Sequence, residues 1–276
     1  MRHNEETFTG GAGVPIFWQS WLPDGPPKAV VVVAHGFGEH SGRYANVVDE
    51  LVPRNYAVYA PDHRGHGRSG GTRALIDKFD YILNDLDVVF AYASRDYPGV
   101  PTFLLGHSMG GNIALGSALR KQSHLKGLIL SGPAISTEGV PKILRLIMRV
   151  LGKIAPKLGV RQLSADSVSR DPAVVKAYVD DPLVHHGKIP AGTGANMMKM
   201  AKDYPTRLPS LTVPLLVVHG SADELVPAAA GQLAHDLAGS KDKTIKIYDG
   251  LAHEVFNEPE RAVVLADVAN WLDDRV

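Results

Sequence analysis

One serine stands in a setting that could make it a nucleophile. It is the centre of the pentapeptide Gly106–Gly110 (GHSMG), which follows a short β-like run and precedes a helical pattern. In a nucleophile elbow the serine occupies a strained turn between a strand and a helix, and the flanking glycines relieve crowding. The positive end of the helix then faces the place where an oxyanion forms. We therefore predict that Ser108 is a catalytic nucleophile; a glycine-rich turn with an incidental serine is the alternative.

A base and an acid for this serine follow the last two β-like runs of the chain. Asp223 comes just after the run Pro214–His219, and His253 comes after the run Thr244–Tyr248. Both therefore fall at the carboxyl ends of strands, in the chain order serine, acid, histidine. His253 would take the proton of Ser108 and give it to the leaving alcohol, while Asp223 fixes the tautomer of His253. The weaker alternatives are His219 and His235 for the base and Glu224 and Asp249 for the acid.

Two backbone N–H groups are candidates for stabilising the oxyanion. The loop His35–Gly38 (HGFG) follows the run Ala29–Ala34 (AVVVVA), and an early loop of this kind supplies one donor in such sites. We assign the donors as the backbone N–H groups of Phe37 and Met109. His35 itself is expected to make structural hydrogen bonds.

No metal site or cofactor is expected. His185 and His186 are adjacent rather than one helical turn apart, and no carboxylate cluster accompanies them. Cysteine is absent, which excludes disulfides and thiolate ligands.

The elements that must position these residues alternate between strands and helices. This alternation predicts an α/β fold with a mostly parallel, doubly wound sheet. Together with the nucleophile elbow and the order serine, acid, histidine, it indicates the α/β-hydrolase fold. Continuous apolar runs of this kind are typical of strands buried on both faces. The expected strands are 6–9, 15–21, 29–34, 56–60, 102–105, 125–131, 214–219 and 244–248, and the expected helices are 43–54, 77–94, 109–121, 228–238 and 258–273.

The alternation breaks once, between the sixth and seventh of these strands. Residues 135–206 carry helical and irregular patterns without a buried-strand run. We interpret them as a cap inserted into a core formed by residues 1–134 and 207–276.

One stretch of this cap has the pattern of an amphipathic helix that binds membranes. Val140–Leu158 places Lys142, Arg145, Arg149 and Lys153 at three- and four-residue spacing, beside a repeat of Ile143, Ile147, Leu151 and Ile154, and no acidic residue lies between Gly139 and Ala165. Basic amphipathic helices lie in anionic lipid interfaces. The alternative is an ordinary cap helix with its apolar face on the core.

The overall composition favours a cytoplasmic protein. The 276 residues include 29 Lys and Arg against 29 Asp and Glu, so no global field attracts nucleic acid. The N-terminus has no apolar segment of a signal peptide, and no apolar run has the length of a membrane span. We expect a cytoplasmic location with peripheral membrane contact through the cap; nothing in the sequence sets an oligomeric state.

The sequence resembles the monoacylglycerol lipases, particularly the bacterial members. The matching stretches cover nearly the whole chain, cap included: HGFGEHSGRY (35–44), DHRGHGRS (62–69), FLLGHSMGG (103–111), DPLVHHG (181–187), GSAD (220–223) and KIYDGLAHEVFNE (246–258). The resemblance implies hydrolysis of a monoacylglycerol to glycerol and a fatty acid. It also implies that Glu39, Arg43 and His107 reach the glycerol head group, with Tyr178 of the cap nearby; a local ion pair is the alternative role for Glu39 and Arg43.

Other functions are compatible with the same three catalytic residues. A broader carboxylesterase or lysophospholipase would use identical chemistry, and an acyltransferase would replace water by another acceptor. A non-catalytic binding protein of this fold would be expected to lack one of the three residues. The resemblance implies that a lipid substrate, a monoacylglycerol, is the partner.

Overall fold

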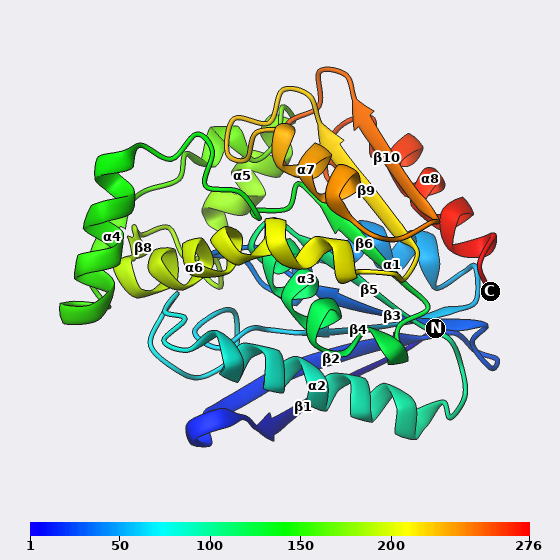
Figure 1. Cartoon of the computed structure of the whole chain (residues 1–276). Coiled ribbons are helices and arrows are strands. Elements are labelled where there is room, and N and C mark those ends of the chain that lie inside the picture. The colour runs from blue at the N-terminus through cyan, green and yellow to red at the C-terminus, as the bar shows by residue number, and fades with distance from the viewer.

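The computed structural model describes all residues, 1–276, and is built around one eight-stranded sheet (Figure 1). The strand order is β1-β2-β4-β3-β5-β6-β9-β10. β1 and β2 pair antiparallel, as do β2 and β4, and every other neighbouring pair is parallel. The strands are β1 (Arg2–Thr9), β2 (Pro15–Leu22), β3 (Ala29–Ala34), β4 (Tyr56–Pro61), β5 (Thr102–His107), β6 (Gly127–Ser131), β9 (Leu215–Gly220) and β10 (Lys243–Tyr248).

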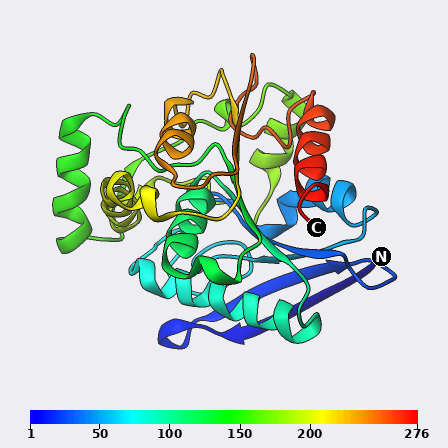
Figure 2. The ribbon, with the colours of Figure 1, turned by 45° about the vertical axis from the view of Figure 1, so that its right-hand side comes forward.

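Helices cover both faces of this sheet and enclose two separate apolar cores (Figure 2). On one face lie α1 (Ala45–Leu51) and α8 (Arg261–Asp273). On the other lie α2 (Phe79–Asp96), α3 (Met109–Lys121) and α7 (Ala229–Leu237). Alternate residues of the central strands enter opposite cores: Val30 and Val32 join the α2 side, whereas Val31 and Val33 join the α1 side. This two-sided burial explains the unbroken apolar runs of the sequence.

The structure confirms the expected α/β-hydrolase fold, and the elements differ from expectation mainly at their ends. β1 begins at Arg2, four residues before its expected start, because its outer half pairs with β2 although its side chains are exposed. α1 is shorter than expected. Ser41–Tyr44 form a 3₁₀ turn before it, and Asn55, with a φ of 71°, follows its C-terminal end. Such positive φ values stop a helix.

Between β6 and β9 the chain leaves the main sheet and forms three helices at one side of it (Figure 1). These are α4 (Lys142–Ile154), α5 (Pro172–Asp180) and α6 (Ala191–Arg207), with a small two-stranded sheet of β7 (Gly159–Arg161) and β8 (Ile189–Pro190). The C-terminal part of α6 packs on the core, where the buried Tyr204 hydroxyl donates to the Asn112 carbonyl of α3. None of the helices has both the length and the apolar composition needed to cross a membrane.

Candidate active site

Ser108 lies on a sharp turn between β5 and α3. Its φ of 54° and ψ of −117° are a strained conformation for a residue with a side chain. The turn needs glycine on both sides, because a Cβ on Gly106 would lie 2.3 Å from the Gly110 carbonyl oxygen and one on Gly110 would lie 1.9 Å from that of Ala34. This close packing of α3 against β5 and β3 holds the serine backbone in place.

The two assigned oxyanion donors lie beside this serine with their N–H groups free. The backbone N–H of Met109 is at the first position of α3, where no helical partner exists. Neither it nor the N–H of Phe37 donates a hydrogen bond within the protein. Phe37, Ser108 and Met109 line the same cavity. The arrangement provides two unpaired donors near one hydroxyl, as stabilisation of an oxyanion requires.

Asp223 and His253 form a buried pair at the carboxyl ends of β9 and β10. The distance from His253 Nδ1 to Asp223 Oδ2 is 2.6 Å. The other oxygen, Oδ1, accepts from the backbone N–H groups of Leu225 and Val226, each at 2.9 Å. Burial by itself would raise the pKa of Asp223, but hydrogen bonds from His219 and His253 hold this pKa well below its ordinary value. Asp223 is therefore a fixed, ionised acceptor for His253.

His253 and Ser108 face one cavity but are not hydrogen-bonded to each other in this structure. Catalytic hydrogen bonds of this kind are often longer in ligand-free enzymes and tighten when substrate binds. The cavity has a volume of about 140 Å³ and is lined mainly by apolar side chains from α4, α6 and the loops of the inserted segment. These include Met148, Leu163, Ile189 and Met197, and Leu225 from the loop after β9 lines the same cavity.

The rival histidine and acid residues lie elsewhere or have other partners. His219 is fully buried and its Nε2 lies 3.1 Å from Asp223 Oδ2, so it is a neighbour of the acid rather than of the serine. His235 pairs with its own neighbour, Asp236. Glu224 accepts from Ser167, and Asp249 accepts from Ser221.

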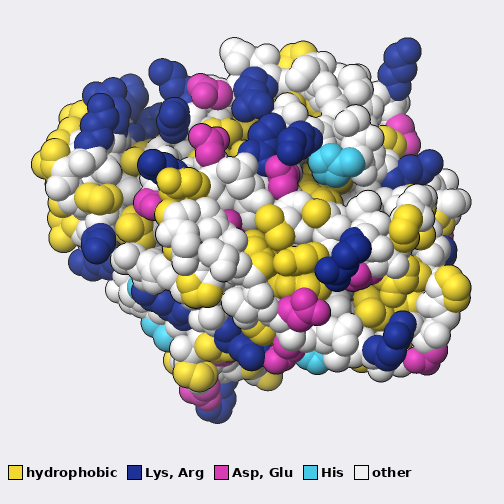
Figure 3. Space-filling model, turned by 90° about the horizontal axis from the view of Figure 1, so that it is seen from below, with side chains coloured by type: hydrophobic (Ala, Val, Ile, Leu, Met, Phe, Trp, Pro, Cys, Tyr) yellow, Lys and Arg dark blue, Asp and Glu magenta, His cyan; other side chains and the backbone are white.

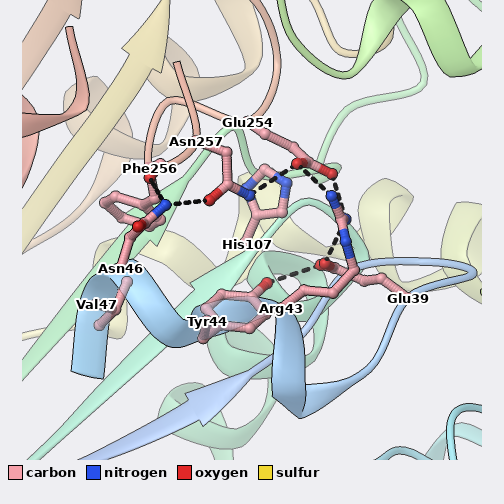
Figure 4. Close-up of a pocket in the computed structure, with 9 residues that line it drawn as sticks. All are labelled: Glu39, Arg43, Tyr44, Asn46, Val47, His107, Glu254, Phe256 and Asn257. Atoms are coloured by element: carbon pink, nitrogen blue, oxygen red, sulfur yellow. Dashed lines mark hydrogen bonds and ion pairs between the residues drawn. The ribbon is translucent and has the colours of Figure 1, made fainter. Parts of the chain in front are cut away.

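A second, smaller cavity lies beside His253 and contains a buried ionic network (Figure 4). Arg43 donates two hydrogen bonds to Glu254, at 2.6 and 2.9 Å, and a third to Glu39 at 3.0 Å. The other oxygen of Glu39 accepts from the Gly36 N–H at 2.6 Å and the Tyr44 hydroxyl at 2.7 Å. The network therefore joins the loop that carries Phe37 to the residue that follows His253.

The pKa values of the two carboxylates of this network are shifted in opposite directions. Burial raises the pKa of Glu39, and the charge of Arg43 offsets this only in part. The pKa of Glu254 is lowered because Arg43 outweighs the opposing effect of burial. Burial and the charge on Arg43 thus favour Glu254 as the ionised partner of the guanidinium.

Of the four residues assigned to the glycerol head group, Glu39, Arg43 and His107 line this second cavity, and none of the four lines the cavity that holds Ser108. Arg43 forms ion pairs with both Glu39 and Glu254. The His107 ring is 4.7 Å from the His253 ring, centre to centre, and burial lowers the pKa of His107 to about 3. The Arg43 guanidinium lies 4.7 Å from the centre of the Tyr178 ring.

Glu254 is the functional candidate that sequence reasoning missed. It lies next to His253 in HEVFNE, and a charged residue directly after the candidate general base is the only signal that could have indicated it. Its partner Arg43 is 211 residues away in the chain, so the pairing is invisible in the local pattern.

We expect Glu254→Gln to destabilise the protein by about 3 kcal/mol, because removal of one member of a buried ion pair leaves the other charge poorly compensated. The matched control is Glu6→Gln, which alters an exposed carboxylate on β1 and should change stability by less than about 0.5 kcal/mol. Urea unfolding of both variants measures the difference. Equal midpoints for the two variants would show that the network contributes nothing to stability.

Comparisons with known proteins agree with this site. The family model described as "Serine aminopeptidase, S33" matches residues 25–260. The monoacylglycerol lipase of Mycolicibacterium smegmatis is 46% identical over 270 residues, which are 98% of this chain and 96% of that protein. Human monoglyceride lipase is 35% identical, with 95% of this chain and 88% of the human protein covered. Among solved structures, the monoacylglycerol lipase of Paleococcus ferrophilus superposes with a TM-score of 0.84 at 28% identity, and both chains are covered completely.

Proposed function

The chain belongs to the monoacylglycerol lipase family, and on that premise we propose that it hydrolyses monoacylglycerols to glycerol and free fatty acids. One observation carries the proposal: the His253–Asp223 pair and the free N–H groups of Phe37 and Met109 surround Ser108 at the wall of one apolar cavity. An apolar cavity with a few convergent polar groups suits an acyl chain with an ester at its end.

The proposed reaction proceeds through an acyl-enzyme. His253 removes the proton from the Ser108 hydroxyl, and the oxygen attacks the ester carbonyl carbon. The carbonyl oxygen gains negative charge and accepts hydrogen bonds from Phe37 N–H and Met109 N–H. As the ester bond breaks, His253 gives its proton to the glycerol oxygen. Water then attacks the acyl-serine by the same steps, and the fatty acid leaves.

The glycerol head group is proposed to bind near Glu39, Arg43, His107 and Tyr178. Support comes from one polar group that this cluster leaves free, the Tyr178 hydroxyl, which forms no hydrogen bond within the protein. It lies over the loop of Phe37, and a Cβ on Gly38 would be 3.5 Å from it. Glu39 and Arg43 then act mainly by holding the shape of this polar pocket.

The segment 135–206 is proposed to act as a cap that delivers lipid to the cavity. α4 exposes Ile143, Ile147 and Ile154 to solvent, and its Met148 lines the cavity that holds Ser108. An exposed apolar face next to a lipid-binding cavity supports transient contact of a cytoplasmic enzyme with a membrane surface.

Tyr178→Phe tests the head-group assignment. This variant removes the free hydroxyl and keeps the ring over Arg43. We expect wild type to hydrolyse 1-oleoylglycerol with a higher kcat/KM than methyl oleate in the same micelles. One hydrogen bond is worth about 1 kcal/mol, so Tyr178→Phe should reduce that preference about fivefold.

The ratio of the two kcat/KM values, measured by fatty acid release, decides between two outcomes. Equal rates on both esters in wild type would identify a general carboxylesterase instead. An unchanged ratio in Tyr178→Phe would remove Tyr178 from the head-group site.

A further inference from the structure

A groove between α4 and α6 is lined by an unusual concentration of positive charge. It has a volume of about 940 Å³ and lies on the other side of the α4–α6 contact from the cavity that holds Ser108; Met198 lines both. Six cationic side chains line it, namely Lys142, Arg145, Arg149 and Lys153 from α4 and Lys199 and Lys202 from α6.

None of these six cations forms an ion pair within the protein. The only acidic residue of the groove is Asp77, which lies 3.9 Å from Arg64. Arg145 donates one hydrogen bond, to the Thr137 hydroxyl, and its buried Nε atom has no partner. Arg145 and Arg149, and likewise Arg149 and Lys153, are four residues apart on one helix, where like charges are destabilising. An anion from outside the protein would therefore stabilise this concentration of positive charge.

The neighbouring surface indicates where that anion comes from. The surface of α4 next to these cations carries the exposed apolar side chains of Ile143, Leu146, Val150 and Ile154. Figure 3 shows this juxtaposition at the end of the molecule where α4 lies: Lys and Arg side chains gather beside hydrophobic ones at the outermost edge. A soluble anion would not require an exposed apolar face beside it, whereas a membrane lipid presents its phosphate directly above its acyl chains.

We propose that the α4–α6 groove binds the phosphate headgroup of an anionic membrane phospholipid. This binding lays the apolar face of α4 in the acyl region, with Met148 and Met198 between the lipid and the catalytic cavity. The proposal rests on the proposed action on lipids, and it adds a binding site distinct from the one that holds the substrate.

The two lysines of α6 provide the test, because they lie outside the amphipathic helix. The double variant Lys199→Gln/Lys202→Gln removes two groove charges and leaves α4 unchanged. The matched control, Lys126→Gln/Lys241→Gln, removes two exposed and unpaired charges. They precede β6 and β10, at the amino-terminal ends of these strands, whereas Ser108 and the inserted segment follow carboxyl ends of strands. Co-sedimentation with vesicles of phosphatidylcholine alone, or of an equimolar mixture with phosphatidylglycerol, measures binding.

Each lysine near an anionic surface contributes about fivefold to binding, so the groove variant should lose at least about tenfold in its partition onto the mixed vesicles. The control should bind these vesicles as wild type does, and the two variants should not differ on phosphatidylcholine alone. A groove variant that behaves like the control would overturn the proposal and leave α4 alone as the contact. A second result would also overturn the proposal. If inorganic phosphate stabilises wild type but not the groove variant, while both bind the mixed vesicles equally, the groove binds a soluble anion instead.

The proposed function is tested by a separate measurement. Turnover of a short-chain, water-soluble monoacylglycerol by wild type requires no membrane. If this turnover is observed but the groove variant binds vesicles as the control does, only the proposed phospholipid site is refuted. If this turnover is absent, the proposed function is refuted.

Discussion

Ser108→Ala is expected to lower kcat for fatty acid release by about 10⁴-fold or more, since it removes the hydroxyl that we propose forms the acyl-enzyme. The residual rate would come from Phe37 N–H, Met109 N–H and the binding of substrate. Fatty acid release under saturating substrate measures the loss.

Ser108→Gly separates this chemical loss from any loss of folding. The φ of 54° at position 108 is strained for alanine and serine but ordinary for glycine. Ser108→Gly should therefore be equally inactive and more stable than wild type by about 1 kcal/mol. An active Ser108→Ala enzyme, or a glycine variant that unfolds more easily than wild type, would contradict this account of the turn.

Asp223→Asn is expected to lower kcat by about 10⁴-fold, because an amide stabilises the wrong tautomer of His253 and cannot stabilise the imidazolium. The backbone N–H groups of Leu225 and Val226 still meet a carbonyl oxygen, so the loop should keep its shape. The pH dependence of kcat and thermal unfolding together measure the effect. A loss of only a few-fold would place the acid elsewhere, and Glu224→Gln is the control because that carboxylate accepts from Ser167 instead.

The lowered pKa of Asp223 also predicts how stability depends on pH. In the folded protein this carboxyl titrates below its ordinary value of 3.8, so ionised Asp223 stabilises the fold above that pH. The contribution falls as pH drops through 3.8 towards the folded pKa. The wild-type enzyme should therefore lose stability relative to Asp223→Asn as pH is lowered from about 5 to 3. A constant difference between them over this range would contradict the assigned hydrogen bonds.

The sequence was sufficient to predict how Ser108, Asp223 and His253 come together. Each follows a strand, and parallel strands bring their carboxyl ends to one edge of a sheet, so chain order determines spatial proximity. The strands β3 to β6 were predictable for a related reason, since burial on both faces demands continuous apolar runs.

The features that the sequence did not reveal depend on pairs of residues far apart in the chain. The Arg43–Glu254 pair joins the start of the chain to its end, and no local pattern records it. The groove likewise needs Lys199 and Lys202 of α6 beside α4. The sequence shows α4 as amphipathic, but the close packing of the two helices, with Gly152 against Ala195 and Gly194 against Met148, is visible only in the structure.

The most direct test of the central claim is fatty acid release from monoacyl-, diacyl- and triacylglycerols and a lysophospholipid, with wild type and Ser108→Ala assayed side by side. We predict release largely confined to monoacylglycerol and absent in the variant. Equal release from all four esters would contradict the substrate assignment and leave a general esterase. Release that survives Ser108→Ala would contradict the catalytic assignment itself.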